Sequence, residues 1–569
     1  YNFYTGFQET TRTLPTLNGT QYASYLNESY SNAGNPLPFP NVGGLGEGVN
    51  WQNEVLDRNV PIISHDINLQ GGSEKITYAV SGSHIDQEGL VGGEKSSFLR
   101  NTARLALGAD LTDKLKLNTN ITYTYFNRRN LNENALGSVL FNALNVSPLQ
   151  QPRDEFGNFT LVPATAGFGN EIINPLAQIA NTYNTYHFKK LNGTFGLDYE
   201  LIKGLTITSR IGFNTANSES KSFSPIVDYG GTKVFNNTRS SVTQGAVNDN
   251  NYTFDLFATY QKSIAESHNF TVTLGNTIYK EWGNGLYATG YDVPNNSWEF
   301  ADINLANGLP LQKPVSSYTY DDRRLSYFGR VQYDYKGRYL LSAMIRRDMS
   351  TRFGPDNRVA YFPSFTGGWV LSDEPFFKQN NILTFAKIRA SYGTLGNDLI
   401  GSNLYTSLLT GEAMYVFDNT LTAGTATGII TNPNVKWEEA KKFDVGVDLN
   451  FFNDEVTFVA DYFVDTRTDL LIPNIPVSGI LGGGAPGAGL PTINAGDVKN
   501  YGLELAIGYK KNLSDDFRID VNYNVTFLKN KTTEVRNQTG WLQSGNFGVG
   551  EAAARMEVGR PMGYFYGYR

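Results

Sequence analysis

The chain has 569 residues, a formal net charge of −7, 40% hydrophobic residues and no cysteine. The lack of cysteine excludes disulfides and thiolate metal sites. The negative charge argues against a nucleic-acid-binding protein, which normally carries a basic surface. No uninterrupted apolar run is long enough for a transmembrane helix. The 34 Tyr, 35 Phe and 58 Gly favour an all-β chain that is rich in turns.

Alternating apolar and polar residues predict β-strands from residues 1–8 onward. The segments 115–125, 195–201 and 205–213 each place apolar side chains on one face and mostly polar ones on the other. Later in the chain, residues 443–449 and 519–527 repeat this pattern, with isolated exceptions. A period of two is that of a strand with one buried face, so we predict antiparallel β-structure along the whole chain.

The clearest hairpin lies in residues 326–354, on either side of the polar turn Lys336-Gly337-Arg338. Each of its strands has one face rich in tyrosine and aliphatic residues, formed by Tyr327, Val331, Tyr333 and Tyr335 before the turn and by Tyr339, Leu341, Ala343 and Ile345 after it. Aromatic residues crowd the turn, as in a membrane-spanning hairpin at the point where it leaves the lipid.

Short and long connections alternate along the chain. The short turns fall at 71–74, 111–113, 202–204, 264–267, 336–338, 452–454 and 512–516. Long polar or Gly-rich segments separate them, at 9–60, 128–184, 217–249, 282–317, 395–438, 468–497 and 531–559, and one connection, 372–384, is longer than this alternation predicts. Outer-membrane barrels have short periplasmic turns and long external loops, whereas soluble β-sandwiches have shorter loops and no aromatic band. We therefore predict a transmembrane antiparallel β-barrel with residues 336–338 on the periplasmic side.

The pattern predicts about eighteen strands, the last beginning at Gly559. A barrel must close, because an open edge would leave backbone groups without partners in lipid. No closing strand is visible after residue 559, so we expect the barrel to be incomplete at its C-terminal end. A barrel of about 22 strands is wide enough to need a plug, and we find no candidate for a plug in this sequence.

Several segments, in order and at appropriate separations, carry a family resemblance. They are residues 2–8, 71–91, 326–354, 361–377, 386–398, 432–452, 496–509 and 559–569. Together they resemble the SusC/RagA family of TonB-dependent outer-membrane transporters of Bacteroidetes. The resemblance implies a 22-stranded barrel in the cell outer membrane, with residues 1–569 as the barrel domain and with the N-terminal plug and the C-terminal closing strands outside this chain. It also implies a SusD-like lipoprotein partner, contact with TonB through a segment outside this chain, and an oligosaccharide or oligopeptide cargo.

Residues that could support catalysis form no enzyme motif. The four histidines, His65, His84, His187 and His268, lie far apart in the sequence, and none has a metal-ligand partner at the usual spacing. The sequence shows neither a nucleophile elbow nor a phosphate-binding loop. We therefore expect no enzyme, no catalytic residue, no metal and no cofactor.

Aromatic residues on the predicted external side are candidates for ligand binding. Trp282, Trp298 and Tyr318 lie in or beside a long loop, where rings could stack on the apolar faces of sugars. The competing interpretation, which we favour, is that these rings belong to the external aromatic girdle or to loop packing.

Charged residues at predicted external strand ends are further candidates. These are Arg347, Asp348 and Arg352 at the end of the hairpin. Arg389, Asn397 and Asp398 lie at the end of the next strand that is predicted to run from the periplasmic to the external side. They could contact an acidic or peptide cargo, but a structural ion pair at a strand end is the favoured role.

Two functions remain open at this point. The first is TonB-dependent import of a bulky nutrient through the lipid bilayer. The second is a structural or interaction barrel for adhesion or for a secretion assembly, without a cargo of its own. A siderophore or cobalamin transporter is a weaker third hypothesis, because the matched segments belong to a different family.

Overall fold

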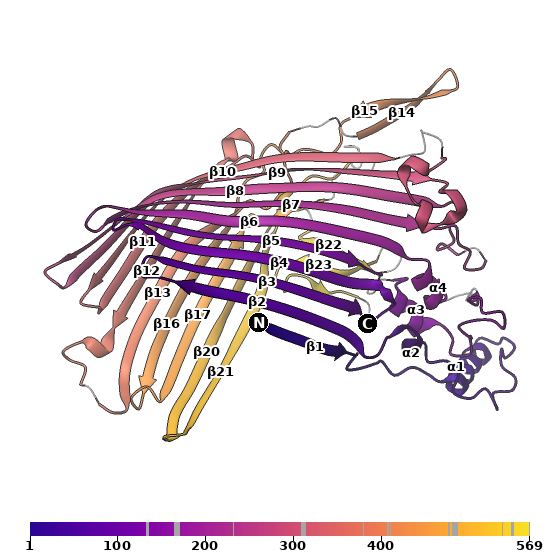
Figure 1. Cartoon of the computed structure of the whole chain (residues 1–569), viewed down its shortest axis with the longest axis horizontal. Helices are drawn as coiled ribbons and strands as arrows, with labels where there is room; N and C mark the ends of the chain where they lie inside the picture. The colour runs from indigo at the N-terminus through magenta and orange to yellow at the C-terminus, as the bar shows by residue number, and fades with distance from the viewer. Residues whose placement is uncertain are drawn as a thin grey trace.

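One large antiparallel sheet dominates the chain in the computed structural model (Figure 1). The structure describes residues 1–132, 136–163, 171–231, 233–308, 314–378, 380–406, 409, 411–475, 478, 480, 488–537, 539–547 and 551–567. Seventeen strands form the main sheet, and each pairs with the next main-sheet strand along the chain. This sequential order confirms the prediction of an antiparallel barrel wall.

The main-sheet strands have the following bounds: β1 (Asn2–Gln8), β2 (Val60–Gly72), β3 (Ile76–Gly89), β4 (Gly93–Thr112), β5 (Leu115–Arg129), β6 (Tyr183–Ile202), β7 (Leu205–Ser224), β8 (Ser241–Ile264), β9 (His268–Tyr291), β10 (Val315–Tyr335), β11 (Tyr339–Ser350), β12 (Val359–Val370), β13 (Leu383–Asn397), β16 (Glu438–Phe451), β17 (Val456–Thr468), β20 (Gly496–Ser514) and β21 (Phe517–Val535).

The connections contain smaller elements. The helices are α1 (Gly19–Asn32), α2 (Trp51–Val55), α3 (Val139–Asn145) and α4 (Pro175–Ala180), and the 3₁₀ turns are η1 (Pro294–Asn296), η2 (Trp298–Phe300), η3 (Ile303–Leu305), η5 (Pro355–Asn357) and η6 (Leu371–Asp373). The small strands are β14 (Gly411–Phe417), β15 (Thr420–Ala426), β18 (Leu471–Ile472), β19 (Ile493–Asn494), β22 (Trp541–Phe547), β23 (Glu551–Glu557) and β24 (Tyr564–Phe565). None of the described helices is both long and apolar enough to cross a bilayer.

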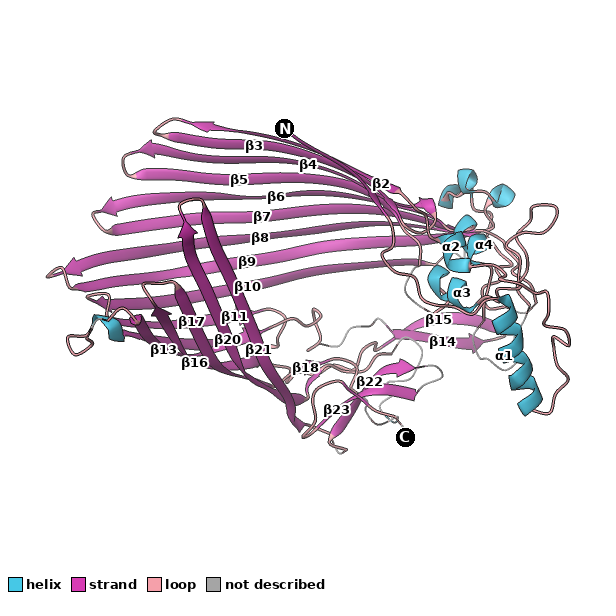
Figure 2. Ribbon diagram, turned by 90° about the horizontal axis from the view of Figure 1, so that it is seen from below, coloured by secondary structure: helices cyan, strands magenta, loops and turns pink. Residues whose placement is uncertain are grey.

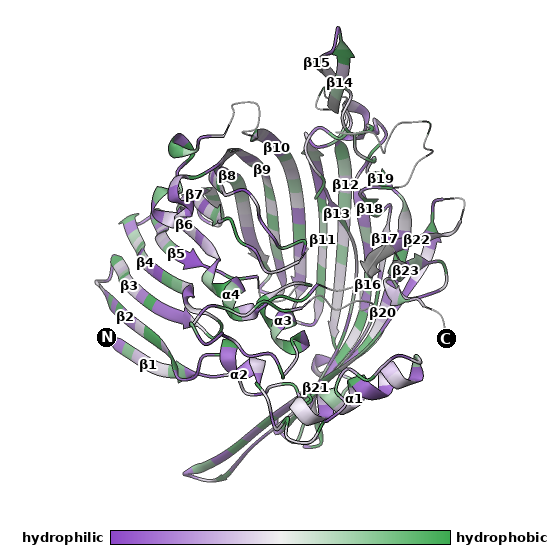
Figure 3. Cartoon of the chain, turned by 90° about the vertical axis from the view of Figure 1, so that its right-hand side faces the viewer, coloured by the Kyte–Doolittle hydropathy of each residue, from purple (hydrophilic) through white to green (hydrophobic). Residues whose placement is uncertain are grey.

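The main sheet curves around an interior, as the end-on view in Figure 3 shows. The main-sheet strands from β11 to β21 form a wall that faces strands β2 to β10, as the view from below shows (Figure 2). β1 and β21 are the two edges of the sheet within the described part of the chain. The segment from Gly559, which we predicted to start another barrel strand, instead places β24 in a separate three-stranded sheet with β22 and β23.

The two faces of the sheet differ in polarity, as the alternation predicts. Apolar side chains on the outer face are strongly exposed, for example Leu274 at 61%, Leu341 at 56% and Phe527 at 59%. A broad band of exposed apolar side chains on regular strands is typical of a surface that faces lipid. The other face carries most of the charged and hydrogen-bonded side chains, so we describe it below as the inner face.

The short turns lie together at one end of the sheet (Figure 1). In the hairpin of β10 and β11, Tyr335 pairs with Tyr339 around the predicted turn. Lys336 and Gly337 both have positive φ, 54° and 69°, which allows a tight connection between twisted strands. The longer connection between β12 and β13 contains η6, after which Glu374 accepts hydrogen bonds from Arg338 (3.0 Å), Trp369 (2.9 Å) and Tyr339. This carboxylate fastens the connection to the ends of β11 and β12.

At the opposite end, strands continue into segments that we expected to be loops. Residues 217–249 and 282–317 were predicted as loops, but β7 runs to Ser224, β8 begins at Ser241, β9 runs to Tyr291 and β10 begins at Val315. The prediction was wrong because segments such as 214–222 are polar on both faces and carry no period-two signal. Their backbones nevertheless continue the ladder, and β8 and β9 reach 24 residues each, more than the roughly 9–11 needed to cross a bilayer.

The long connections at this end pack against one another. Trp51 and Val55 of α2, Leu131, and Val139 and Ala143 of α3 belong to one buried cluster. The Trp51 indole donates a hydrogen bond to the carbonyl of Ser147 at 3.0 Å. Helices α2, α3 and α4 therefore form a compact structure at the end of the sheet opposite the short turns (Figure 1).

Candidate functional site

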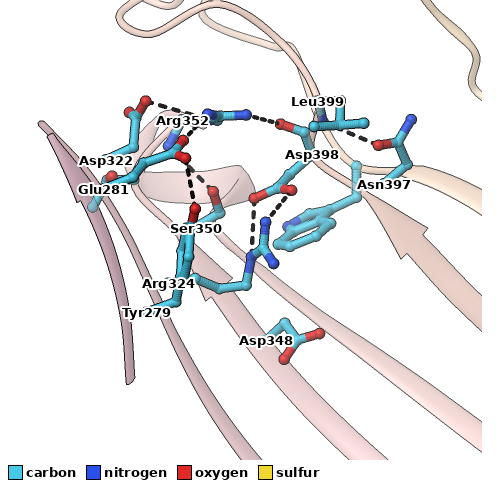
Figure 4. Close-up of polar contacts among 12 residues, drawn as sticks. Tyr279, Glu281, Asp322, Arg324, Asp348, Ser350, Arg352, Asn397, Asp398 and Leu399 are labelled. Atoms are coloured by element: carbon cyan, nitrogen blue, oxygen red, sulfur yellow. Dashed lines mark hydrogen bonds and ion pairs between the residues drawn. The ribbon is translucent and has the colours of Figure 1, made fainter. Parts of the chain in front are cut away.

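Charged side chains from β9, β10 and the ends of β11 and β13 meet on the inner face near the loop end (Figure 4). Arg352 forms ion pairs with Glu281 and with Asp322, the latter at 3.2 Å, and donates to the carbonyl of Asp398 at 3.3 Å. Arg324 donates from Nε to the carboxylate of Asp398 at 3.1 Å. We call these five residues the upper network.

Two of the three acidic members of the upper network are buried, and the third, Glu281, has a side chain that is 22% exposed. Asp322 and Asp398 are 6% and 5% exposed. Further hydroxyls satisfy the carboxylates, since Ser402 donates to Asp322 at 2.6 Å and Tyr279 donates to Glu281 at 2.7 Å. A buried carboxylate needs such partners, because an unpaired charge inside a protein is costly. The network therefore fixes the positions of four strands relative to one another at the end of the sheet that carries the long loops.

A second charged pair lies next to the upper network on the same face. Arg346 donates from Nε to Asp348 at 2.8 Å and from Nη2 to the hydroxyl of Ser326 at 2.8 Å. Asp348 and Ser326 are opposite each other on paired strands, and both are buried. Asp348 is therefore held by β11 and β10, which agrees with the structural role that we favoured.

A third cluster surrounds Arg389, which we call the Arg389 cluster. Its guanidinium contacts Asp448 on β16 at 3.1 Å, Asp444 on β16 at 3.5 Å and Asp461 on β17 at 2.7 Å. Gly446 makes room for this arrangement, because a Cβ there would lie 2.9 Å from the Arg389 Cζ and would also overlap Asp461. Arg389 lies in the middle of β13, so our expectation that it belongs to the strand end was wrong.

Two of the predicted binding residues lie on the outer face. Arg347 is opposite Tyr327 on β10 and Tyr361 on β12, and both tyrosines are more than half exposed. Trp282 lies in strand β9, where its ring is 6.1 Å from that of Tyr252 and Lys280 lies 4.9 Å from its centre. These positions separate Arg347 and Trp282 from the upper network.

Trp298 packs within the external loops. It lies in η2, stacks on Tyr183 at 5.9 Å and carries the Lys221 ammonium 4.3 Å from its ring centre. It contacts a buried cluster that includes Phe223 and Val242. This surrounding agrees with the loop-packing role favoured from the sequence.

The remaining predicted residues lie on or near the inner face. Tyr318 belongs to β10, on the same face as Asp322, and is 45% exposed. Asn397 accepts a hydrogen bond from the backbone of Leu399 at 3.0 Å and so shapes the chain beside Asp398. The upper network thus brings together two predicted residues, Arg352 and Asp398, with Asn397 beside them.

Sequence reasoning missed three members of the upper network: Glu281, Asp322 and Arg324. Asp321, Asp322, Arg323 and Arg324 form a charged run between the predicted loop 282–317 and the predicted hairpin 326–354, and we gave this run no role. Had the strand been extended through this run, the period of two would have placed Asp322 and Arg324 together on one face. The partners from β9 and β13 could not be found without the sheet curvature.

The histidines are closer in space than their sequence spacing suggested. His65 and His84 pair across β2 and β3, with ring centres 6.1 Å apart. His65 hydrogen-bonds the Tyr1 hydroxyl at 2.8 Å, and His84 hydrogen-bonds Asn101 at 2.7 Å. Within the described ranges, no group of three or more metal-ligating side chains is arranged to hold a metal ion.

Ion pairs also join the external loops. Arg239 donates to Asp292 from Nε at 2.8 Å and from Nη2 at 2.7 Å, which links the connection after β7 to the connection after β9. The hydrogen bonds from Arg239 lower the pKa of the Asp292 carboxyl, and those to Asp292 raise the pKa of Arg239. This two-bond geometry is the strong form of an arginine–carboxylate contact.

An apolar outer face, charged inner networks, short turns at one end and packed loops at the other define an outer-membrane β-barrel. Residues 129–555 match the family described as TonB dependent receptor-like, beta-barrel. The chain belongs to this family, and its barrel is an outer-membrane structure.

Similar proteins come from two bacteria. The chain is 28% identical to TonB-dependent receptor P26 of Formosa agariphila over 544 residues, covering 94% of this chain and 52% of that protein. It is 27% identical to TonB-dependent receptor SusC of Bacteroides thetaiotaomicron over 561 residues, covering 94% and 52%. The chain therefore spans about half the length of these relatives.

The fold also matches that of a chain in a solved structure. The structure of the RagAB peptide transporter matches with a TM-score of 0.82 and 21% identity, over 99% of this chain and 63% of that chain. At this identity the match establishes the fold. The family and the relatives confirm the resemblance that the sequence segments indicated.

Proposed function

We propose that the chain is the barrel wall of a TonB-dependent importer that carries a bulky nutrient, an oligosaccharide or an oligopeptide, across the outer membrane. The observation that carries this proposal is the inner face, where the upper network, the Arg346–Asp348 pair and the Arg389 cluster form successive polar layers. A polar inner wall inside an apolar outer face suits the passage of a hydrophilic solute. The barrel itself supplies binding and passage and performs no catalysis.

The proposal includes parts that lie outside this chain. We infer that the full-length protein adds a plug domain, a TonB-contacting segment and the strands that close the barrel. Support comes from the relatives, which have about as much chain again outside the matched region. A SusD-like lipoprotein over the packed external loops is the proposed surface partner, as the similarity to the TonB-dependent receptor SusC suggests.

Uptake in cells tests the proposal. A deletion strain is grown on single glycans and peptides as nutrient sources, and uptake of labelled forms is measured with and without TonB. We expect the deletion to abolish uptake of one nutrient class and loss of TonB to have the same effect. Undiminished uptake of every candidate in the deletion strain would contradict import.

Co-purification separates import from the scaffold alternative. Import predicts a lipoprotein partner together with a bound nutrient. A stable assembly with adhesion or secretion components, and unchanged uptake of all nutrients, would favour the scaffold instead.

A further inference from the structure

Three tyrosines on the inner face each lie over a glycine on the neighbouring strand. Tyr287 is directly opposite Gly245, and Tyr318 and Tyr320 are directly opposite Gly285 and Gly283. A Cβ added to these glycines would lie 2.5 Å from Cε1 of Tyr287, 2.7 Å from Cζ of Tyr318 and 2.7 Å from Cε1 of Tyr320. Each ring therefore occupies the space that a side chain would otherwise fill.

The position over glycine leaves part of each ring free. Tyr287 and Tyr318 remain 36% and 45% exposed although the backbone covers one side of them. Any larger residue at one of the three glycines would displace the ring above it. The result is a set of aromatic surfaces that face the interior and depend on these glycines.

A second aromatic group lies on the same face, on β4, β5 and β6. Phe126 stacks on Phe188 with ring centres 4.8 Å apart, and Phe98 and Tyr186 lie 5.5 Å and 5.9 Å from Phe126. Arg128 lies 5.1 Å from the centre of the Tyr186 ring. This group is partly exposed as well.

The strand register joins the two groups. The pairs Phe188–Ser218, Ser218–Val247, Val247–Gly285 and Gly285–Tyr318 run directly across β6 to β10. With strands about 4.8 Å apart, about 15 Å separates the backbone under Phe188 from that of Gly285. The interval between the two aromatic groups carries only short side chains in this row, those of Ser218 and Val247. The two groups and the interval therefore form one long surface. We call it the aromatic shelf.

Polar groups border the aromatic shelf. Asp249 accepts a hydrogen bond from the Tyr320 hydroxyl at 2.8 Å. Glu281 lies two residues from Gly283 on the same face of β9. Ser218 and Ser220 lie in the interval. Rings with carboxylates and hydroxyls beside them suit a ligand that has both apolar ring faces and many hydroxyls.

The same strands offer no edge to an extended peptide. The backbones of β7, β8 and β9 pair with strands on both sides over the shelf. A peptide could not bind here by strand addition, which needs an unpaired edge. Ring stacking requires no backbone partner, so the shelf favours a sugar chain.

We propose that the aromatic shelf is a binding site for pyranose rings of an oligosaccharide on the barrel wall. This inference rests on the proposed import function and assigns its cargo to the carbohydrate class. The sugar rings stack on Tyr287, on Tyr318 and on the second aromatic group around Phe126. The sugar hydroxyls form hydrogen bonds with Asp249 and Glu281.

Calorimetry on the full-length protein tests the shelf. The probes are purified glucan, mannan, galactan and xylan oligosaccharides of four to seven sugars and a pool of peptides of four to ten residues. We expect one oligosaccharide to bind and Tyr287→Ala and Tyr318→Ala each to weaken it about 3- to 10-fold, the effect of losing one ring contact. Tyr318→Phe should bind normally, whereas Gly285→Ala should weaken binding because it displaces the Tyr318 ring.

The control is Tyr361→Ala, which removes a ring on the outer face and should leave binding unchanged. All variants are first checked for a normal folded barrel by heat-dependent gel mobility. Unchanged oligosaccharide affinity in the Tyr287 and Tyr318 variants, or binding of peptides alone, would overturn the shelf. A second result would also overturn the shelf: the protein takes up peptides in a TonB-dependent way, and these variants leave that uptake unchanged. The proposed import function would still stand in that case. Failure of all TonB-dependent uptake would instead contradict the proposed function.

Discussion

Arg389 shows how one side chain can hold three barrel strands together. It extends from β13 and contacts aspartates on both β16 and β17. Asp461 is only 14% exposed, so a cationic partner is needed to offset its removal from water. The sequence revealed the alternation that places Arg389 on the polar face, but the convergence of three carboxylates depends on register between strands far apart in the chain.

Removing Arg389 should destabilise the barrel. Arg389→Ala leaves several carboxylates without their cation, and we expect the free energy of unfolding to fall by about 2 kcal/mol, between the values for exposed and for buried pairs. Urea unfolding of the full-length protein in lipid vesicles measures this change. The control, Arg323→Ala, removes a pair whose arginine is 63% exposed and should change stability by less than about 0.5 kcal/mol. Equal effects of the two variants would contradict the account of the Arg389 cluster.

The Arg239–Asp292 link predicts a pH dependence of the loops. The folded-state pKa of Asp292 is lowered by Arg239, so the link is complete above the unfolded value of about 3.9 and is lost as pH falls through the lower folded value. Limited proteolysis by an acid-active protease should therefore cut the connection after β7 faster as pH falls below about 4. With a second protease that is active at neutral pH, Arg239→Gln should be cut in this connection faster than the parent. Identical cleavage of the parent and the variant at neutral pH would refute the link.

At the level of elements, the sequence predicted strands best where one face meets lipid. The hairpin of β10 and β11 was predicted with its turn correctly placed, because period two and a polar turn point to the same structure. The ends of β7 to β10 near the long loops were missed because they include stretches that are polar on both faces, such as residues 214–222, or rich in glycine, such as residues 283–290. As a result, Trp282 was assigned to a loop and Tyr318 to the border of that loop, although both lie in strands. The pairing that defines those strand ends becomes visible only in three dimensions.

The hairpin turn provides a test at this scale. Gly337 has a φ of 69°, a conformation that costs a residue with a Cβ roughly 1 kcal/mol. Gly337→Ala should lower the free energy of unfolding by about that amount, whereas Lys336→Gly, at a φ of 54°, should not lower it. Urea unfolding in vesicles compares the two. A larger loss from Lys336→Gly than from Gly337→Ala would contradict the turn geometry.

Across the whole molecule, the assignment of the two faces decides what the barrel can do. Leu274 lies on the outer face of β9, and Thr271 lies on the inner face of the same strand. We expect Leu274→Lys to destabilise the barrel by about 2–4 kcal/mol, the cost of a cation at the middle of the lipid-facing band. Thr271→Lys should cost less than about 1 kcal/mol, since its side chain meets water inside. Reversed costs in vesicle unfolding would mean that the faces are exchanged.

Import requires the packed loops to face outward and the short turns to face the periplasm, so the proposed function depends on the orientation of the barrel. The chain has no cysteine, so single cysteines can report it in a full-length protein whose other cysteines, if present, are replaced. Leu305→Cys marks the external connection after β9, and Asp113→Cys marks the turn between β4 and β5. A bulky, membrane-impermeant maleimide should label Leu305→Cys in intact cells and Asp113→Cys only after the outer membrane is opened. Labelling of Asp113→Cys alone in intact cells would show that the short turns face outward and would rule out this orientation.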